Sequence, residues 1–105
     1  MARIISTEEF VNEVELSKEI TVVDFFASWC GPCKMLLPIF ERLEEDMKED
    51  AKFLKVDIDK SLELARQFEI HTVPTVIVFK DGKEVDRLVG FIPKQKLEEM
   101  VKSHI

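Results

Sequence analysis

The sequence predicts an α/β fold in which a central mixed β-sheet of about five strands is covered on both faces by about four helices. Strand-like apolar runs alternate with segments of helical periodicity over most of the chain. The last two strand-like runs are instead joined by Asp81-Gly82, a hairpin signal that indicates an antiparallel pair. A length of 105 residues is enough for one domain, residues 1–105, and too short for two.

The first predicted helix begins near Thr7, after a short apolar start. Ser6 and Glu9 have the spacing of a capping box, and Ile5 and Phe10 have the spacing of a hydrophobic staple. We expect this helix to bury its apolar residues Phe10, Val11 and Val14.

The second strand and the second helix follow a polar turn. Residues 20–27 are apolar on both faces, which is typical of a central strand that is covered on both sides. Asp24 is the exception, because an ionised carboxylate is costly in such a strand unless it is paired. A long helix is predicted from about Pro32 to Met47, with one apolar stripe made of Leu36, Phe40, Leu43 and Met47.

The remaining elements complete the alternation. Residues 53–58 are predicted as a strand, and Ser61 can cap a short helix after it. The hairpin strands are predicted at 75–80 and 85–90, and Pro93 opens the last helix. That helix is expected to bury Leu97, Met100 and Val101.

Both cysteines of the chain, Cys30 and Cys33, fall where the 20–27 strand ends and the long helix begins. The first N–H groups of a helix lack partners and, with the helix dipole, favour negative charge, so a thiol placed there ionises more easily. Helix geometry separates the two Cα atoms by roughly 5 Å, within the range of a disulfide. The spacing therefore predicts a reversible dithiol–disulfide pair with Cys30, nearer the helix start, as the nucleophile.

Two other interpretations of the cysteines are disfavoured by the sequence. Half of a zinc site would need about four ligands, and only His71 and His104 remain, neither at finger-like spacing. Inert thiols are disfavoured by the position at a helix start. We therefore predict no metal site.

The composition excludes several classes of function. A formal net charge of −6 argues against nucleic-acid binding, and no stretch approaches the roughly 20 apolar residues of a membrane span. The first residues lack the apolar region of a signal peptide, so we expect a reducing cytoplasm. Two cysteines three apart in that compartment indicate redox chemistry more than a structural bridge.

Several motifs together resemble the thioredoxin family over nearly the whole chain. They are Trp29-Cys30-Gly31-Pro32-Cys33-Lys34 after a strand that carries Asp24, Thr72-Val73-Pro74-Thr75, and Val89-Gly90-Phe91. The resemblance implies a thioredoxin fold and a protein-disulfide reductase that is re-reduced by a thioredoxin reductase. No bound cofactor is implied, because the electrons reside in the Cys30–Cys33 disulfide. Disulfide-containing client proteins are the implied partners, and we expect a monomer.

The resemblance also implies roles for residues outside the cysteine pair. Asp24 would be a buried acid with a raised pKa that moves a proton to or from Cys33. The alternative is a structural carboxylate that pairs with Lys55, and the two roles are compatible. A cis bond is implied before Pro74, with the Val73 backbone pairing with an extended client. Further positions match the apolar client-docking surface of the family, namely Trp29, Gly31, Pro32, Ile58, Gly90 and Phe91, although plain core is the alternative for Ile58 and Phe91.

Two other functions are compatible with the sequence. A disulfide oxidase or isomerase has the same fold, although Gly31-Pro32 between the cysteines matches the reducing members. A non-enzymatic subunit of a larger assembly would use the fold without the cysteines.

Overall fold

The computed structural model describes residues 1–105 and contains one five-stranded sheet in the order β1-β3-β2-β4-β5. β1, β3 and β2 are parallel to one another, whereas β4 is antiparallel to both β2 and β5. The strands are β1 (Arg3–Ile4), β2 (Thr21–Phe26), β3 (Lys52–Asp57), β4 (Thr75–Lys80) and β5 (Lys83–Val89). The helices are α1 (Thr7–Phe10), α2 (Gly31–Met47), α3 (Leu62–Gln67) and α4 (Lys94–Lys102).

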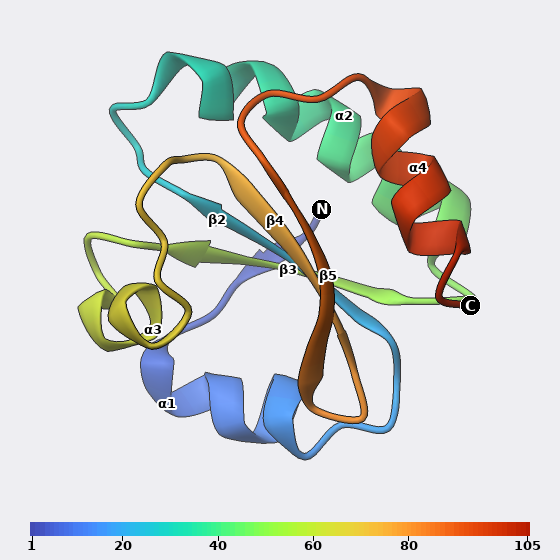
Figure 1. Ribbon diagram of the computed structural model, residues 1–105, viewed down its shortest axis with the longest axis horizontal. Coiled ribbons are helices and arrows are strands. Elements are labelled where there is room, and N and C mark those ends of the chain that lie inside the picture. The colour runs from blue at the N-terminus through green and yellow to red at the C-terminus, as the bar shows by residue number, and fades with distance from the viewer.

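The sheet forms the middle of three layers (Figure 1). α2 and α4 cover one face, and α1 and α3 cover the other, which confirms the predicted mixed sheet between helices. Side chains along β2 alternate between two cores: Val22 packs with the α2 and α4 side chains, and Val23 packs with Phe10 and Leu64 of the opposite layer. None of the helices is both long enough and apolar enough to cross a membrane.

The first helix begins as predicted but changes its winding. The Ser6 hydroxyl accepts the Glu9 N–H at 3.1 Å, and the Glu9 carboxylate accepts the Ser6 N–H at 2.9 Å, so the capping box is confirmed. Beyond Phe10 the chain continues as a π-helical turn, η1 (Val11–Glu15). The wider turn changes which side chains face the sheet. The prediction that Val11 is buried is therefore wrong, since Val11 is exposed while Phe10 and Val14 are buried.

The short helix α3 also differs in one detail from the expectation. Ser61 precedes it, but the Ser61 side chain makes no capping hydrogen bond. Its backbone, at φ −125° and ψ 63°, departs from the extended conformation that aims a capping hydroxyl at the helix. By contrast, α4 begins directly after Pro93 and buries Leu97, Met100 and Val101 as predicted.

The hairpin between β4 and β5 turns at the predicted residues. Asp81 and Gly82 both have positive φ, 52° and 77°, as a type I′ turn requires. A Cβ on Gly82 would lie 2.1 Å from the carbonyl oxygen of Glu15. The hairpin therefore packs against the end of η1 so closely that only glycine fits.

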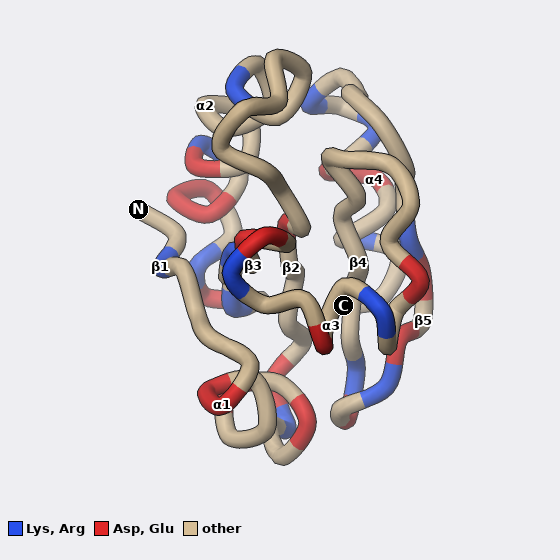
Figure 2. Tube along the Cα trace, turned by 90° about the vertical axis from the view of Figure 1, so that its left-hand side faces the viewer, with Lys and Arg blue, Asp and Glu red and all other residues tan.

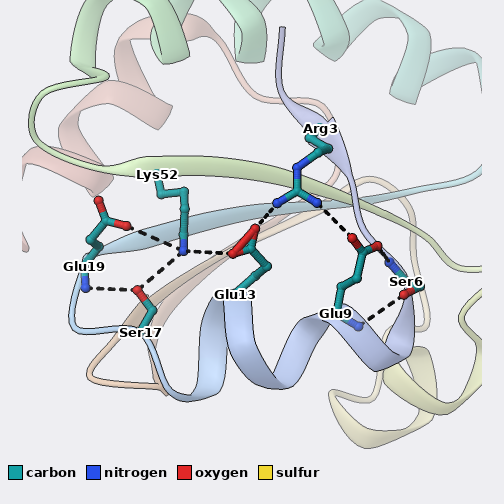
Figure 3. A network of polar contacts seen from close by, with 7 residues as sticks. All are labelled: Arg3, Ser6, Glu9, Glu13, Ser17, Glu19 and Lys52. Atoms are coloured by element: carbon teal, nitrogen blue, oxygen red, sulfur yellow. Dashed lines mark hydrogen bonds and ion pairs between the residues drawn. The ribbon is translucent and has the colours of Figure 1, made fainter.

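A network of polar contacts ties the N-terminal strand and helix to the start of β3 (Figure 3). The Arg3 guanidinium contacts the carboxylates of Glu9 and Glu13. The Lys52 ammonium lies 3.7 Å from Glu13 and 3.6 Å from Glu19. Glu13 is the shared member, since both cations contact its carboxylate.

Replacing Glu13 by Gln is expected to lower the free energy of unfolding by about 1 kcal/mol, because it leaves two cations without their common partner. Urea unfolding at low and high NaCl measures the effect, which should shrink with salt. Glu45→Gln is the matched control, since Glu45 is exposed and pairs only with Lys48. A loss no larger than that of Glu45→Gln, or one that salt does not change, would contradict the prediction.

Candidate active site

The site begins at the carboxyl end of β2, where the chain turns into α2. Cys30 is the residue that caps α2, with an extended backbone at φ −88° and ψ 117°. Its Sγ accepts a hydrogen bond from the backbone N–H of Cys33 at 3.2 Å. A sulfur that receives an N–H at a helix N-terminus is held where negative charge is favoured.

Cys30 and Cys33 form a disulfide with a Cα–Cα distance of 5.3 Å, as the helix geometry predicted. Each residue is only 4% exposed. They form a small cluster with Ala27, against which Ile58 and Val73 pack among others. The pair is therefore covered by apolar side chains on the side of the β3–α3 and α3–β4 loops.

Asp24 lies on β2, the strand that leads to the cysteines, and is 1% exposed. Neither of its carboxylate oxygens has a hydrogen-bond partner. Burial raises the pKa of Asp24 to about 7, and the charge of the nearby Lys55 opposes this rise with a smaller effect. A carboxyl group with this pKa can take up or release a proton near neutral pH.

A cavity of about 250 Å³ is shared by Asp24 and Cys33. Asp24, Cys33 and Lys55 all line it, and Lys34 also contributes to its wall. The remaining lining residues are Ile4, Phe26, Ala27, Ser28 and Leu37. Asp24, the predicted proton carrier, and Cys33 therefore line the same partly open cavity.

Lys55 does not pair with Asp24, although the two residues are direct neighbours in the register of β2 and β3. Its ammonium lies 3.7 Å from Oε2 of Glu41, on α2, and this is the only ion pair that it forms. The alternative interpretation, in which Asp24 forms an ion pair with Lys55, is therefore wrong. The reason is that a second carboxylate competes for the same ammonium.

The loop before β4 approaches the cysteines from the opposite side. The Val73–Pro74 peptide bond is cis, as the resemblance implied. The Val73 carbonyl oxygen lies 3.6 Å from Cys30 Sγ, and the Pro74 carbonyl accepts the Gly90 N–H at 2.7 Å. The Val73 carbonyl thus lies next to the Cys30 sulfur, and the Gly90 N–H is bound to the residue that follows Val73.

The other predicted docking residues differ in their surroundings. Trp29 is 67% exposed, and its indole N–H donates to Asp59 at 2.8 Å. Phe91 is 43% exposed, so plain core is the wrong interpretation for it. Ile58 is half-buried and packs against the cysteine cluster. Gly31 and Pro32 are exposed at the start of α2.

A family model described as thioredoxin matches residues 2–103. The chain belongs to the thioredoxin family. It is 47% identical to the thioredoxin of Mycoplasmoides gallisepticum over 90% of this chain and 99% of that protein. It is 48% identical to the thioredoxin of Staphylococcus saprophyticus over 82% of this chain and 83% of that protein.

A solved structure agrees with the sequence relatives. The crystal structure of Malassezia sympodialis thioredoxin superposes with a TM-score of 0.90 at 34% identity, covering 99% of this chain and 90% of that chain. The protein is a thiol–disulfide oxidoreductase, and its Cys30–Cys33 pair is the redox-active disulfide. Thioredoxins carry no cofactor, since the electrons are held by the two cysteines.

Two polar residues of this site could not be selected from the sequence. Asp59 binds the Trp29 indole, and Glu41 binds Lys55. Both are acidic residues in a chain with 21 of them, so composition gives no reason to select either. The histidines stand apart from the cysteines: His71 is exposed, and His104 contacts Asp86 at 2.9 Å.

Proposed function

We propose that the protein reduces disulfide bonds of client proteins with Cys30 as the attacking group. The Cys30 thiolate attacks one sulfur of the client disulfide, forms a mixed disulfide and releases the other client sulfur as a thiolate. The observation that carries this assignment is the Cys33 N–H that points at Cys30 Sγ from 3.2 Å. The same N–H would stabilise negative charge on Cys30 in the reduced protein.

Cys33 completes the cycle. Its thiolate attacks Cys30 Sγ, which forms the Cys30–Cys33 disulfide and expels the second client thiolate. Two electrons have then passed from the protein to the client. Cys33 must lose a proton to react, and Asp24 is the proposed acceptor because it lines the same cavity and has a pKa raised to about 7.

Clients are proposed to bind over the surface around Cys30. An extended client segment would hydrogen-bond to the Val73 backbone, next to the Cys30 sulfur. Apolar groups around it, all of them half-buried or exposed except Pro74, would receive the client side chains. The proposed contact residues are Trp29, Gly31, Pro32, Ile58, Val73, Pro74, Gly90 and Phe91.

Electrons are proposed to return through a thioredoxin reductase, the general partner that the family implies. The proposed setting is the cytoplasm, where a reducing poise keeps dithiols available. Residues 1–105 are proposed to act as one domain and as a monomer, because the exposed aromatic residues Trp29 and Phe91 belong to the proposed client surface.

The test is insulin reduction by NADPH and a thioredoxin reductase, with and without the protein. We expect NADPH oxidation to depend on both the protein and insulin, because the dithiol carries electrons between them. Dithiothreitol in place of the reductase gives a second measurement that needs no protein partner. Acceleration by dithiothreitol but not by the reductase would overturn only the proposed partner.

Two outcomes would favour the other interpretations. Faster oxidation of a reduced client than reduction of an oxidised one would indicate a disulfide oxidase. An absence of acceleration over dithiothreitol alone, with a stable protein partner recovered, would indicate a structural subunit.

A further inference from the structure

We propose that Glu41 is a positioning residue that holds the Lys55 ammonium away from the Asp24 carboxyl and so keeps this carboxyl available for the Cys33 proton. The inference rests on the proposed role of Asp24. It concerns a contact between α2 and β3 that lies outside the cysteine motif.

The strand register places Lys55 beside Asp24. The two residues are opposite each other in the parallel β2–β3 pair, so their side chains leave the same face of the sheet toward α2. Both line the cavity that Cys33 also lines. On the other side of Asp24, its β4 neighbour is the apolar Val76. Lys55 is therefore the adjacent strand neighbour that can neutralise the carboxylate.

The observed contacts show that Lys55 is directed elsewhere. Its Nζ lies 3.7 Å from Glu41 Oε2, while both oxygens of Asp24 have no partner. Lys55 is only 8% exposed, so its ammonium has few other ways to be solvated. Glu41 Oε2 is itself buried without a hydrogen bond, which is the arrangement expected if the lysine is its sole counter-charge.

The charged groups around Asp24 give the direction of the effect. From α2 come Lys34, which is exposed, and Glu41; from β3 comes Lys55, the only buried lysine or arginine of the chain. An ammonium released by loss of Glu41 can approach Asp24 across their shared cavity. A positive charge at that distance favours the ionised carboxylate, as does removal of the negative charge of Glu41. Both effects lower the pKa of Asp24.

The test is the titration of the Asp24 carboxyl carbon followed by NMR in the oxidised protein. We expect the midpoint in Glu41→Gln to fall by about one pH unit relative to the parent protein. Glu45→Gln removes the same charge from the same helix, at an exposed position paired with Lys48, and should leave the midpoint unchanged. Glu41→Asp, which keeps the negative charge, should bring the midpoint part of the way back to that of the parent protein. An unchanged midpoint in Glu41→Gln, or an equal fall in Glu45→Gln, would overturn the proposal.

The same titration in a Lys55→Gln background separates an effect of Glu41 through Lys55 from a direct effect of the Glu41 charge on Asp24. If Glu41 acts by holding the lysine, the Glu41→Gln shift should shrink to less than half when Lys55 is absent. A shift of full size in that background would show a direct effect of Glu41 on Asp24 and would overturn the positioning role.

Release of a client from a mixed disulfide through Cys30 supplies the functional measurement. Glu41→Gln should move the pH profile of this release in the same direction as the Asp24 midpoint. A shifted midpoint with an unmoved profile would overturn the role of Asp24 as proton acceptor and leave the Glu41–Lys55 arrangement standing.

Discussion

Replacement of Cys30 by Ser is expected to abolish disulfide reduction, leaving only the rate of dithiothreitol alone. A hydroxyl in place of the sulfur is not ionised near neutral pH, even where the Cys33 N–H is available to it. Without the first attack, no mixed disulfide forms and Cys33 has nothing to resolve. Insulin reduction measures the rate, and the far-ultraviolet spectrum serves as the control for folding.

Replacement of Cys33 by Ser should have a different outcome, and this contrast tests the order of the two cysteines. The Cys30 thiolate can still attack, but no second thiolate displaces the client. A mixed disulfide through Cys30 should therefore accumulate, and mass spectrometry of the peptides identifies the linked residue. Accumulation in Cys30→Ser instead, with the client linked to Cys33, would reverse the assigned roles.

Replacement of Asp24 by Asn should remove a loss of about 4 kcal/mol in the free energy of unfolding that the parent protein suffers as the pH rises. The pKa of Asp24 is raised from 3.8 to about 7 in the folded protein by burial, so the folded state retains a proton that the unfolded state releases. Stability from this group is complete below about pH 4, falls as the pH rises from about 4 to 7, and stays low above. The Asn variant lacks this loss, because an amide does not ionise.

Urea unfolding of both proteins at pH 4 and pH 8 provides the measurement. The variant should be close to the parent at pH 4 and several kcal/mol more stable at pH 8, since the carboxyl has no hydrogen-bond partner to lose. The same variant should resolve mixed disulfides more slowly, because Cys33 loses its proposed proton acceptor. An equal stability difference at both pH values would show that Asp24 ionises normally in the fold.

The fold could be predicted where local rules and tertiary packing agree. The hairpin at Asp81-Gly82 and the capping box at Ser6 require particular residues at particular backbone angles, so the sequence states them directly. The prediction that Val11 is buried was wrong because a π-helical turn replaces the regular α-helical winding that the periodicity assumes. The prediction that the Ser61 hydroxyl caps α3 was wrong for a similar reason, since the backbone angles of Ser61 are set by the loop around it.

At the candidate site, contacts between residues that are close in the sequence could be predicted, whereas contacts between separate elements could not. Cys30 and Cys33 are fixed by one helical turn, and their spacing gives the observed Cα distance of 5.3 Å. The partner of Lys55 depends instead on which acidic residue of α2 reaches β3, and periodicity does not distinguish Glu41 from its acidic neighbours. Asp24 was identifiable because a single charge stands in an otherwise apolar strand.

The cap of α2 has a consequence for the reducing strength of the protein. The sulfur that closes the helix is the same atom that gains and loses electrons, and in the disulfide it accepts the Cys33 N–H. That N–H favours the anionic, reduced form of the sulfur more than the disulfide. Each 1.4 kcal/mol of such preference raises the reduction potential by about 30 mV and makes the protein a weaker donor of electrons. A stronger cap would therefore speed the first attack while lowering the tendency to give electrons away, and the fold sets the balance between the two.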